Sequence, residues 1–269
     1  MIKDEELEEL IETIQHIYGY DFSGYARASF KRRVNRLLIL DNIPSFAELI
    51  YKIRTDGIYF SKVVEELSVN VTEMFRDPHM YKKLREILPA LIVKPVIRIW
   101  HAGCATGEEV YSMAILLEEL GLLSKSMIYA TDINAAAIQN ISSGIFPLSK
   151  MKLYSENYIQ AGGTEDFSGY YTAKYDLVKF HERFSKKIIV STHNLVSDRS
   201  FNEFQVIFCR NVLIYFDKSL QDQVLQLFDN SLEKLGLLVL GTKENIRFSS
   251  IAGKYSQIEN SEKIWRKHE

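Results

Sequence analysis

Hydrophobic positions along the chain follow two different patterns, and the change comes near residue 90. Up to about residue 75, apolar side chains recur every three or four positions, as at Leu7, Leu10 and Ile14, which is typical of amphipathic helices and not of strands. Glycine favours the left-handed turn that closes a helix, so Gly19 should end the first one. The expected helices are one that ends at Gly19 and three that cover about 24–40, 46–54 and 58–67.

Beyond residue 96, short apolar runs alternate with helical periods. The first run, Val96–Ala102, is compact and is followed by glycine, as a buried strand often is. Alternating strands and helices predict an α/β fold built on a doubly wound, Rossmann-like, mostly parallel sheet. The expected strands are 96–102, 127–133, 187–191, 205–209 and 237–241, the expected helices are 106–120, 134–145 and 219–235, and a terminal antiparallel hairpin should pair 255–258 with 263–266.

One segment, about 147–185, breaks this alternation. It carries Gly162, Gly163 and Gly169, and then a strand-like run over 170–180. It is too long for a plain connection, so it predicts a small inserted β-subdomain. The expected domains are a helical N-terminal domain of 1–75, a linker of 76–95, and an α/β domain of 96–269 that carries the insertion.

Composition and charge narrow the class of protein. The 33 basic and 35 acidic side chains give a net charge of −2, so no overall field draws the chain to nucleic acid or to a membrane surface. Cys104 and Cys209 alone make neither a disulfide framework nor a four-cysteine zinc site, and we expect no metal. The acidic N-terminus is unlike a signal peptide, and no apolar run reaches the roughly 20 residues of a spanning helix. We therefore expect a cytoplasmic protein with no nucleic-acid partner and no membrane insertion.

The strongest local motif is a glycine turn after the first expected strand. Gly103 and Gly107 lie four residues apart, and Glu108 and Glu109 open the helix that follows. Glycines let the backbone approach a ligand, whereas carboxylates at this helix start repel a pyrophosphate and suit a cationic ligand. The motif therefore favours S-adenosylmethionine over NAD. The alternative is a plain tight turn whose two glutamates complement the helix dipole.

Asp132 ends the second expected strand. An acid at this place in a doubly wound fold binds the ribose hydroxyls of a nucleotide cofactor. The alternative is a cap on the next helix, which either Asp132 or Asn134 could supply. Because the glycine turn precedes it, we favour ribose binding.

Two further segments carry candidate polar groups. Asn70, Thr72 and Arg76 lie close together before the sheet begins, although in isolation such residues are more often helix caps and surface charges. The segment 208–216 follows an expected strand at its carboxyl end, the edge where ligands bind in such sheets.

Taken in order, these segments resemble the chemotaxis receptor methyltransferases, the CheR family, over about residues 20–246. The resemblance implies an all-α N-terminal domain, linker residues that contribute to a cofactor site, and an S-adenosylmethionine-binding α/β domain with an inserted β-subdomain. The family motif has two aromatic residues before its arginine, and here Met74 stands at the first of them, an apolar exchange. The matching segments are Asn70-x-Thr72-x-x-Phe75-Arg76, 103–109, 130–133, 193–195 and 209–216.

The resemblance also implies a reaction and a set of residues. The methyl group of S-adenosyl-L-methionine goes to glutamate side chains of chemoreceptors, the methyl-accepting chemotaxis proteins, leaving S-adenosyl-L-homocysteine. Arg76 and Tyr215 are the candidates that orient the substrate carboxylate, Glu109 pairs with the cofactor's amino group, and Asp132 binds its ribose. The residues expected to line the cofactor site are Asn70, Thr72, Arg76, Glu109, Asp132, Asn194, Leu195, Asn211 and Val212.

The second expected helix is basic, with no acidic residue between Phe22 and Leu40. Its charges could be a solvated face, or they could pair with the acidic first helix. The resemblance adds a third use, docking against the methylation-site helices of the receptor's cytoplasmic part, which we favour because like charges repel without a partner. The cations are Arg27, Lys31, Arg32, Arg33 and Arg36.

Two rival functions remain at this point. One is an S-adenosylmethionine-dependent enzyme that acts on a nucleic-acid amine, another protein or a small molecule, but the Asn/Asp-Pro-Pro-aromatic motif of amine-methylating DNA enzymes is missing from Asn211-Val212-Leu213. The other is a receptor-bound adaptor without catalysis, which the loss of Arg76 or Tyr215 would have indicated. Family members also differ in whether they hold a receptor's C-terminal peptide, and the insertion is where this chain would hold one.

Overall fold

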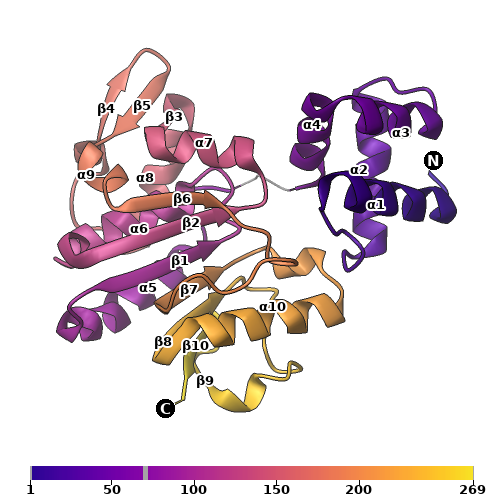
Figure 1. Cartoon of the computed structure of the whole chain (residues 1–269). Helices are drawn as coiled ribbons and strands as arrows, with labels where there is room; N and C mark the ends of the chain where they lie inside the picture. The colour runs from indigo at the N-terminus through magenta and orange to yellow at the C-terminus, as the bar shows by residue number, and fades with distance from the viewer. Residues whose placement is uncertain (1, 69–71, 269) are drawn as a thin grey trace.

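Four helices form the N-terminal domain of the computed structural model, which describes residues 2–68 and 72–268 (Figure 1). Their apolar faces meet in one core, in which Leu10, Ile14 and Val34 are buried. Gly19 ends the first helix as expected, with φ at 74° and its N–H donated to the carbonyl of Gln15. The helices are α1 (Asp4–Tyr18), α2 (Arg27–Leu40), α3 (Phe46–Thr55) and α4 (Gly57–Leu67).

Helix α2 begins at Arg27, three residues later than expected, because the backbone before it pairs with the other domain. The carbonyl of Gly24 accepts the N–H of Asp217 at 2.8 Å, and the N–H of Ala26 donates to the carbonyl of Tyr215 at 2.8 Å. Between these two bonds, Tyr25 and Phe216 form an isolated antiparallel bridge. Residues 24–26 thus join the helical domain to the α/β domain.

A seven-stranded sheet organises the second domain, in the order β6-β2-β1-β7-β8-β10-β9. The first five strands of that order are parallel, and β10 pairs antiparallel with both of its neighbours, which confirms the terminal hairpin. The strands are β1 (Ile97–Ala102), β2 (Ser126–Asp132), β6 (Ile188–Thr192), β7 (Phe204–Cys209), β8 (Leu232–Leu240), β9 (Tyr255–Glu259) and β10 (Ile264–Lys267).

Strand β1 lies between β2 and β7, so the chain winds in opposite directions on its two sides. A ligand crevice forms beyond the carboxyl ends of the strands at such a switch point. In Figure 1 the helical domain lies beyond this end of the sheet. The topology therefore places a site between the two domains.

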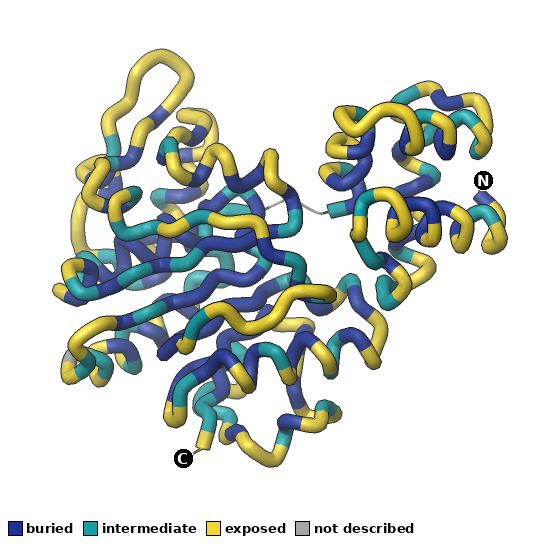
Figure 2. The backbone as a smooth tube through the Cα atoms, in the orientation of Figure 1, coloured by how far each residue is buried: buried dark blue, intermediate teal, exposed yellow. Residues whose placement is uncertain are grey.

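Both faces of the central strands are buried, as the dark strands of Figure 2 show. On one face Ile97 and Ile99 pack against α6 (Glu108–Glu119) and α7 (Ala135–Ser143). On the other face Trp100 packs against α10 (Lys218–Ser231). The helix expected over 219–235 stops at Ser231 because Leu232 already pairs with Phe204 as the first residue of β8.

The segment 76–95, expected as a linker, is a folded part of the α/β domain. It carries α5 (Pro78–Ile87) and a 3₁₀ helix, η1 (Leu88–Val93). Met80, Tyr81 and Leu84 are buried in the core beneath the sheet. Their spacing is that of one helix face.

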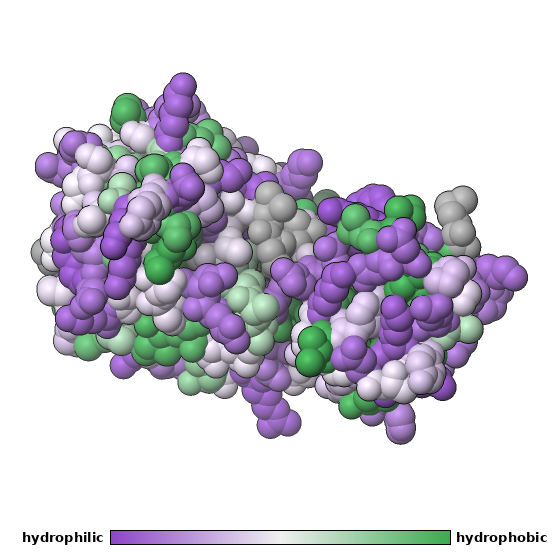
Figure 3. Space-filling view, turned by 90° about the horizontal axis from the view of Figure 1, so that it is seen from above, coloured by the Kyte–Doolittle hydropathy of each residue, from purple (hydrophilic) through white to green (hydrophobic). Residues whose placement is uncertain are grey.

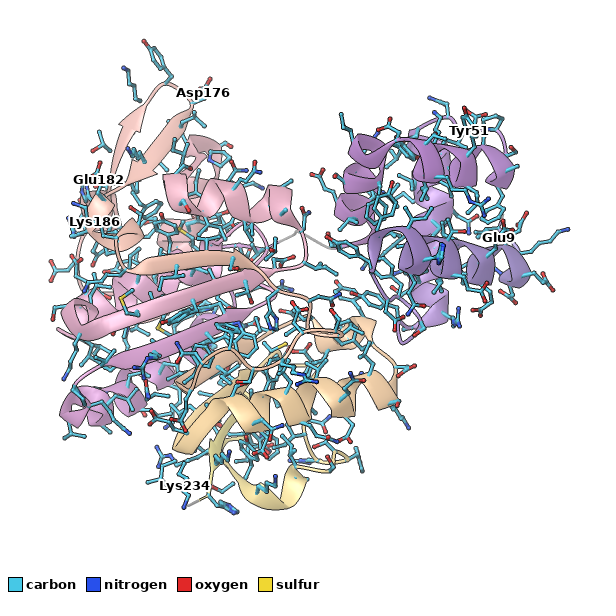
Figure 4. The ribbon with its side chains drawn as sticks, viewed as in Figure 1. Glu9, Tyr51, Asp176, Glu182, Lys186 and Lys234 are labelled. Carbon is cyan, nitrogen blue, oxygen red and sulfur yellow. The ribbon has the colours of Figure 1, made fainter. Side chains whose placement is uncertain are left out.

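The insertion contains a helix as well as strands. The single strand expected over 170–180 is a hairpin, because the chain turns at Tyr175, whose φ is 55°. Its three-stranded sheet has the order β3-β5-β4, and Figure 4 shows Asp176 at its tip and Glu182 and Lys186 at its base. The elements are β3 (Ile145–Pro147), α8 (Met151–Gln160), β4 (Tyr171–Lys174), β5 (Leu177–Phe180) and α9 (Glu182–Ser185).

Neither cysteine is bonded to the other, and both are buried. Burial raises the pKa of both thiols, which favours their neutral form. Among the described residues, no group of three or more His, Cys, Asp or Glu side chains is placed to hold a metal. No helix in the described ranges is both long and apolar enough to cross a bilayer.

Replacing Gly24 should weaken the junction between the domains. A Cβ atom there would lie 2.8 Å from Cδ2 and 2.9 Å from Cβ of Leu220, so backbone or side chain must shift. We expect Gly24→Ala to lower the free energy of unfolding by about 1–3 kcal/mol in chemical denaturation.

Gly57→Ala is the matched control, because Gly57 opens α4 and a Cβ there meets nothing within 4 Å. It should be neutral or stabilising by up to about 1 kcal/mol. Equal effects of the two substitutions would contradict a close approach at residue 24.

Candidate active site

A cavity of about 470 Å³ lies at the carboxyl ends of the parallel strands. The helical domain supplies one wall, with Tyr25 and Leu67. The α/β domain supplies the others, from the ends of β1, β2, β6 and β7 and from the segment before α5. The site is thus complete only with both domains in place.

The glycine turn after β1 folds over the end of β2. The N–H groups of Gly103 and Cys104 donate to the carbonyl of Thr131, at 2.8 and 3.0 Å. Gly103 has φ at 77°, and a Cβ on it would lie 2.5 Å from Cγ2 of Val212. The turn needs glycine here because it packs directly on the loop that follows β7.

Asp132 stands at the cavity floor and links two loops. One carboxylate oxygen accepts the N–H of Ala105 at 2.8 Å and the other accepts the N–H of Asn134 at 3.0 Å. Burial raises the pKa of Asp132, and these two bonds offset only part of that effect. The cap of α7 is Asn134, whose side chain accepts the N–H groups of Ala136 and Ala137. The side chain of Asp132 is therefore not the helix cap, and it lines the cavity.

Glu109 faces the cavity as part of a chain of charged groups. His101 Nδ1 lies 2.8 Å from one of its carboxylate oxygens, and Arg210 Nη1 donates to the other at 2.8 Å. Arg210 also pairs with Asp77, through Nη2. Burial alone would raise the pKa of Glu109, but the bond to His101 and the charge of Arg210 lower it to about 2. Glu109 is therefore ionised near neutral pH. Glu108 instead points into the core, toward Thr106 and Tyr154.

The segment around Arg76 holds an unusual backbone. Phe75 and Asp77, on either side of it, have φ at 52° and 57°, a conformation that costs a non-glycine residue free energy. The N–H of Phe75 donates to the Ser112 hydroxyl at 2.9 Å, and Arg210 holds Asp77. The strain is therefore maintained by neighbouring groups, and it brings Arg76 to the cavity wall.

Glu244 organises the loop after β7. It is buried, and its two oxygens accept four backbone N–H groups at 2.7–3.3 Å. Burial raises the pKa of Glu244, while these bonds favour its charged form. In this way Glu244 holds Asn211, whose φ is 60°, in its left-handed conformation. The donors are the N–H groups of Gly241, Asn211, Val212 and Ile214.

The structure brings the sequence-predicted site residues together on one cavity. Asn194 and Leu195 come from the loop after β6, and Tyr215 from the short helix η5 (Leu213–Tyr215). Asn70 lies outside the described residues. The predicted residues that line the cavity are Thr72, Arg76, Glu109, Asp132, Asn194, Leu195, Asn211, Val212 and Tyr215.

The basic residues of α2 do not form one uncompensated group, which corrects the premise drawn from the sequence. Arg27 pairs with Glu8 at 2.7 Å, and Lys31 with Asp4 at 2.6 Å, so the acidic α1 neutralises two of them. Arg33 turns inward toward Tyr215. Arg32 and Arg36 are exposed and have no acidic partner within the described ranges.

Several residues of the site escaped the sequence analysis. His101 lies in the expected strand 96–102 and Arg210 in the segment 209–216, and a titratable or charged side chain at the end of a buried strand could have indicated them. Asp77, Glu244 and Tyr25 carried no such signal, because only the folded chain brings them to the cavity or its loops.

Comparison with known proteins gives two family matches that together span most of the chain. Residues 70–264 match the SAM-binding domain of CheR methyltransferase, and residues 5–68 match its all-alpha domain. The chain is therefore similar to this family in both of its domains, in the same order as the structure has them.

Individual relatives agree with the family matches. A Pseudomonas putida protein named Cher3 is 43% identical over 265 residues, covering 98% of this chain and 97% of the relative. A chemotaxis protein methyltransferase of Salmonella typhimurium is 31% identical over 234 residues, covering 84% of this chain and 78% of the relative. Among solved structures, the N-methyltransferase NodS of Bradyrhizobium japonicum with S-adenosyl-l-homocysteine aligns at 14% identity and a TM-score of 0.41, covering 74% of this chain and 90% of NodS.

Glu244→Gln should destabilise the fold. Glutamine keeps one acceptor oxygen and presents an NH₂ group to two of the four N–H donors, which then lose their partner. We expect a loss of about 2–4 kcal/mol in the free energy of unfolding. Glu203→Gln removes a carboxylate from an exposed position and should stay within about 0.5 kcal/mol of the parent. A Glu244→Gln variant as stable as this control would show that the four bonds are dispensable.

Proposed function

Because this chain belongs to the CheR methyltransferase family, an S-adenosylmethionine-dependent family of chemotaxis, we propose that it methylates glutamate carboxylates of chemoreceptors. The products are glutamate 5-O-methyl esters and S-adenosyl-L-homocysteine. The observation that carries the proposal is one cavity in which two carboxylates, Glu109 and Asp132, and two candidate carboxylate-orienting groups, Arg76 and Tyr215, meet.

The cavity suits a cofactor with an ammonium group, a sulfonium group and a ribose. Glu109 is ionised and faces the cavity, so it is the partner we assign to the amino group. Asp132 keeps free lone pairs beyond its two backbone bonds, so it is the partner for the ribose hydroxyls. We assign the remaining contacts to Asn70, Thr72, Arg76, Asn194, Leu195, Asn211 and Val212. When bound, S-adenosylmethionine supplies an activated methyl group.

The substrate side needs orientation more than acid–base chemistry. A glutamate carboxylate is already ionised near neutral pH, so no general base is required. Arg76 lines the cavity, and its cation should be directed at the substrate carboxylate, because it would repel a sulfonium. Tyr215 can donate its hydroxyl to the same carboxylate. Catalysis then comes from alignment and from excluding water in a cavity closed by the helical domain.

The docking surface that we propose is the exposed face of α2. Arg32 and Arg36 lie one turn apart on it, and Leu40 continues the same row. Figure 3 shows mostly hydrophilic side chains over the helical domain, with small hydrophobic patches between them. Two cations beside an apolar side chain suit an acidic amphipathic helix, such as the glutamate-bearing helices of a receptor's cytoplasmic part.

A second contact is proposed at the inserted subdomain. β4 is an edge strand of the small sheet, and Thr172–Lys174 are exposed on it. An edge strand can accept an extended peptide as an added strand, which suits a receptor's C-terminal segment. Because receptor helices of this kind lie inside the cell, we place the protein in the cytoplasm.

Methyl transfer to receptors tests the proposed function directly. With methyl-labelled S-adenosylmethionine and membranes that carry the organism's chemoreceptors, we expect label in the receptor band. Mild base should release the label as methanol, because esters hydrolyse and N-methyl groups do not. Receptors whose methylation-site glutamates are replaced by alanine should take up none. Base-stable label, or label in nucleic acid, would refute glutamate methylation.

Charge reversal on α2 tests docking. Arg32→Glu with Arg36→Glu should lower kcat/KM for the receptor at least tenfold and kcat much less, since surface charges act mainly on encounter and register. Salt should slow methylation by the parent protein and hardly affect the variant, because screening acts over about 8 Å.

The control reverses the same number of charges away from the cavity, with Lys186→Glu and Lys234→Glu, two exposed positions. Figure 4 shows Lys234 on the side of the molecule away from the helical domain. If both double reversals reduce kcat/KM equally, net charge rather than docking on α2 governs the reaction.

A further inference from the structure

Arg33 is the one cation of the basic set on α2 that contacts the cavity wall. Its guanidinium carbon lies 4.4 Å from the centre of the Tyr215 ring. Its Nη1 donates to the carbonyl of Leu67, at the end of α4, at 2.5 Å. Arg33 is half-buried, whereas its neighbour Arg32 is exposed. The side chain therefore fills the space between two helices and an aromatic ring of the other domain.

The helical domain also holds the backbone of the same tyrosine. The carbonyl of Tyr215 accepts the N–H of Ala26 at 2.8 Å, just before α2 begins. On the other side of η5, Gln221 Nε2 donates to the carbonyls of Leu213 and Phe216, at 2.9 and 3.0 Å. Main-chain bonds thus fix where the residue sits, and its side chain is partly buried against the apolar core around Trp100.

The contact with Arg33 adds a directional interaction to this packing of the Tyr215 ring. Within the described ranges, the Tyr215 hydroxyl forms no hydrogen bond, and the Arg33 guanidinium lies over the ring face. A planar guanidinium over an aromatic face attracts the ring electrostatically and restricts its orientation. The bond to Leu67 holds that guanidinium in place from the opposite side.

We propose that Arg33 is a positioning residue for Tyr215, and that α2 thereby connects the receptor-docking face to the reacting carboxylate. The inner side of the helix aims the tyrosine hydroxyl, while Arg32 and Arg36 on its outer side bind the receptor. This inference rests on the proposed function, in which Tyr215 orients the glutamate. It assigns Arg33 a role inside the site and removes it from the docking surface.

A double-mutant cycle in the full chain tests the assignment. Arg33→Met keeps the length of the side chain and removes its charge. It should lower kcat for receptor methylation about three- to thirtyfold, the range expected from loss of one cation–π contact. The KM for the receptor and the Kd for S-adenosylhomocysteine should change less than twofold. In a Tyr215→Phe background, Arg33→Met should cause no further loss, because no hydroxyl remains to be aimed.

Two further variants control for charge and folding. Arg54→Met removes an exposed cation from α3 of the same domain, outside the docking face and the cavity, and should leave kcat unchanged. Arg33→Lys keeps the charge without the planar fork, so its kcat should fall between the parent and Arg33→Met. Equal loss of kcat from Arg33→Met in both backgrounds would mean a merely structural role and would overturn the proposal.

Fluorine NMR of protein labelled with 3-fluorotyrosine gives a readout independent of activity. The Tyr215 resonance is assigned by its absence in Tyr215→Phe. It should shift in Arg33→Met and stay in place in Arg54→Met. If the parent fails to methylate receptors while the resonance shifts, the proposed function fails and the Arg33 contact stands. If the parent is active and the resonance does not move, the positioning role is wrong.

Discussion

The site depends on one buried cation, Arg210, at the end of the central strand β7. Its guanidinium is almost wholly enclosed, and two carboxylates neutralise it, Glu109 at the start of α6 and Asp77 at the start of α5. Removing one partner from such a buried group typically costs about 3–5 kcal/mol, because the other charge remains without compensation. Three elements that are distant in sequence are thereby tied to one point. Since Glu109 also contacts His101, β1 joins the same group.

Buried side chains around the cavity stabilise strained, left-handed backbone conformations there. Phe75, Asp77, Ala105 and Asn211 all adopt left-handed conformations around the cavity. Each is held by a buried side chain: Ser112 for Phe75, Arg210 for Asp77, Asp132 for Ala105 and Glu244 for Asn211. Carboxylates that accept backbone N–H groups thus hold the loops in place, and cavity-facing side chains are presented from strained positions, as functional sites often require.

The helical domain is part of the site as well as its neighbour. Residues 24–26 pair with the loop that carries Tyr215, and Arg33 packs on the ring of that tyrosine. α1 neutralises Arg27 and Lys31, so the cations of α2 divide among an internal ion-paired group, an inward-facing arginine and an exposed pair. One helix therefore presents exposed cations on its outer face and a cavity-wall contact on its inner face.

The sequence by itself determined the two-part fold, the succession of strands and helices along the chain, and the segments that meet at the site. Those features depend on short-range patterns: helical periodicity before residue 75, apolar runs after 96, the glycines at 103 and 107 and the acid at 132. Only the tertiary structure decided the rest. The helix within 76–95 is buried in the core beneath the sheet, and the strand that follows Tyr175 pairs with Ile145–Pro147, which lies before α8. The pairing of Arg210 with Asp77 and Glu109 joins residues more than 100 positions apart, and no local pattern encodes such a contact. Which cations of α2 point inward was likewise fixed by where α1, α4 and the Tyr215 loop came to lie, because a charged side chain takes whichever partner the folded chain places within reach.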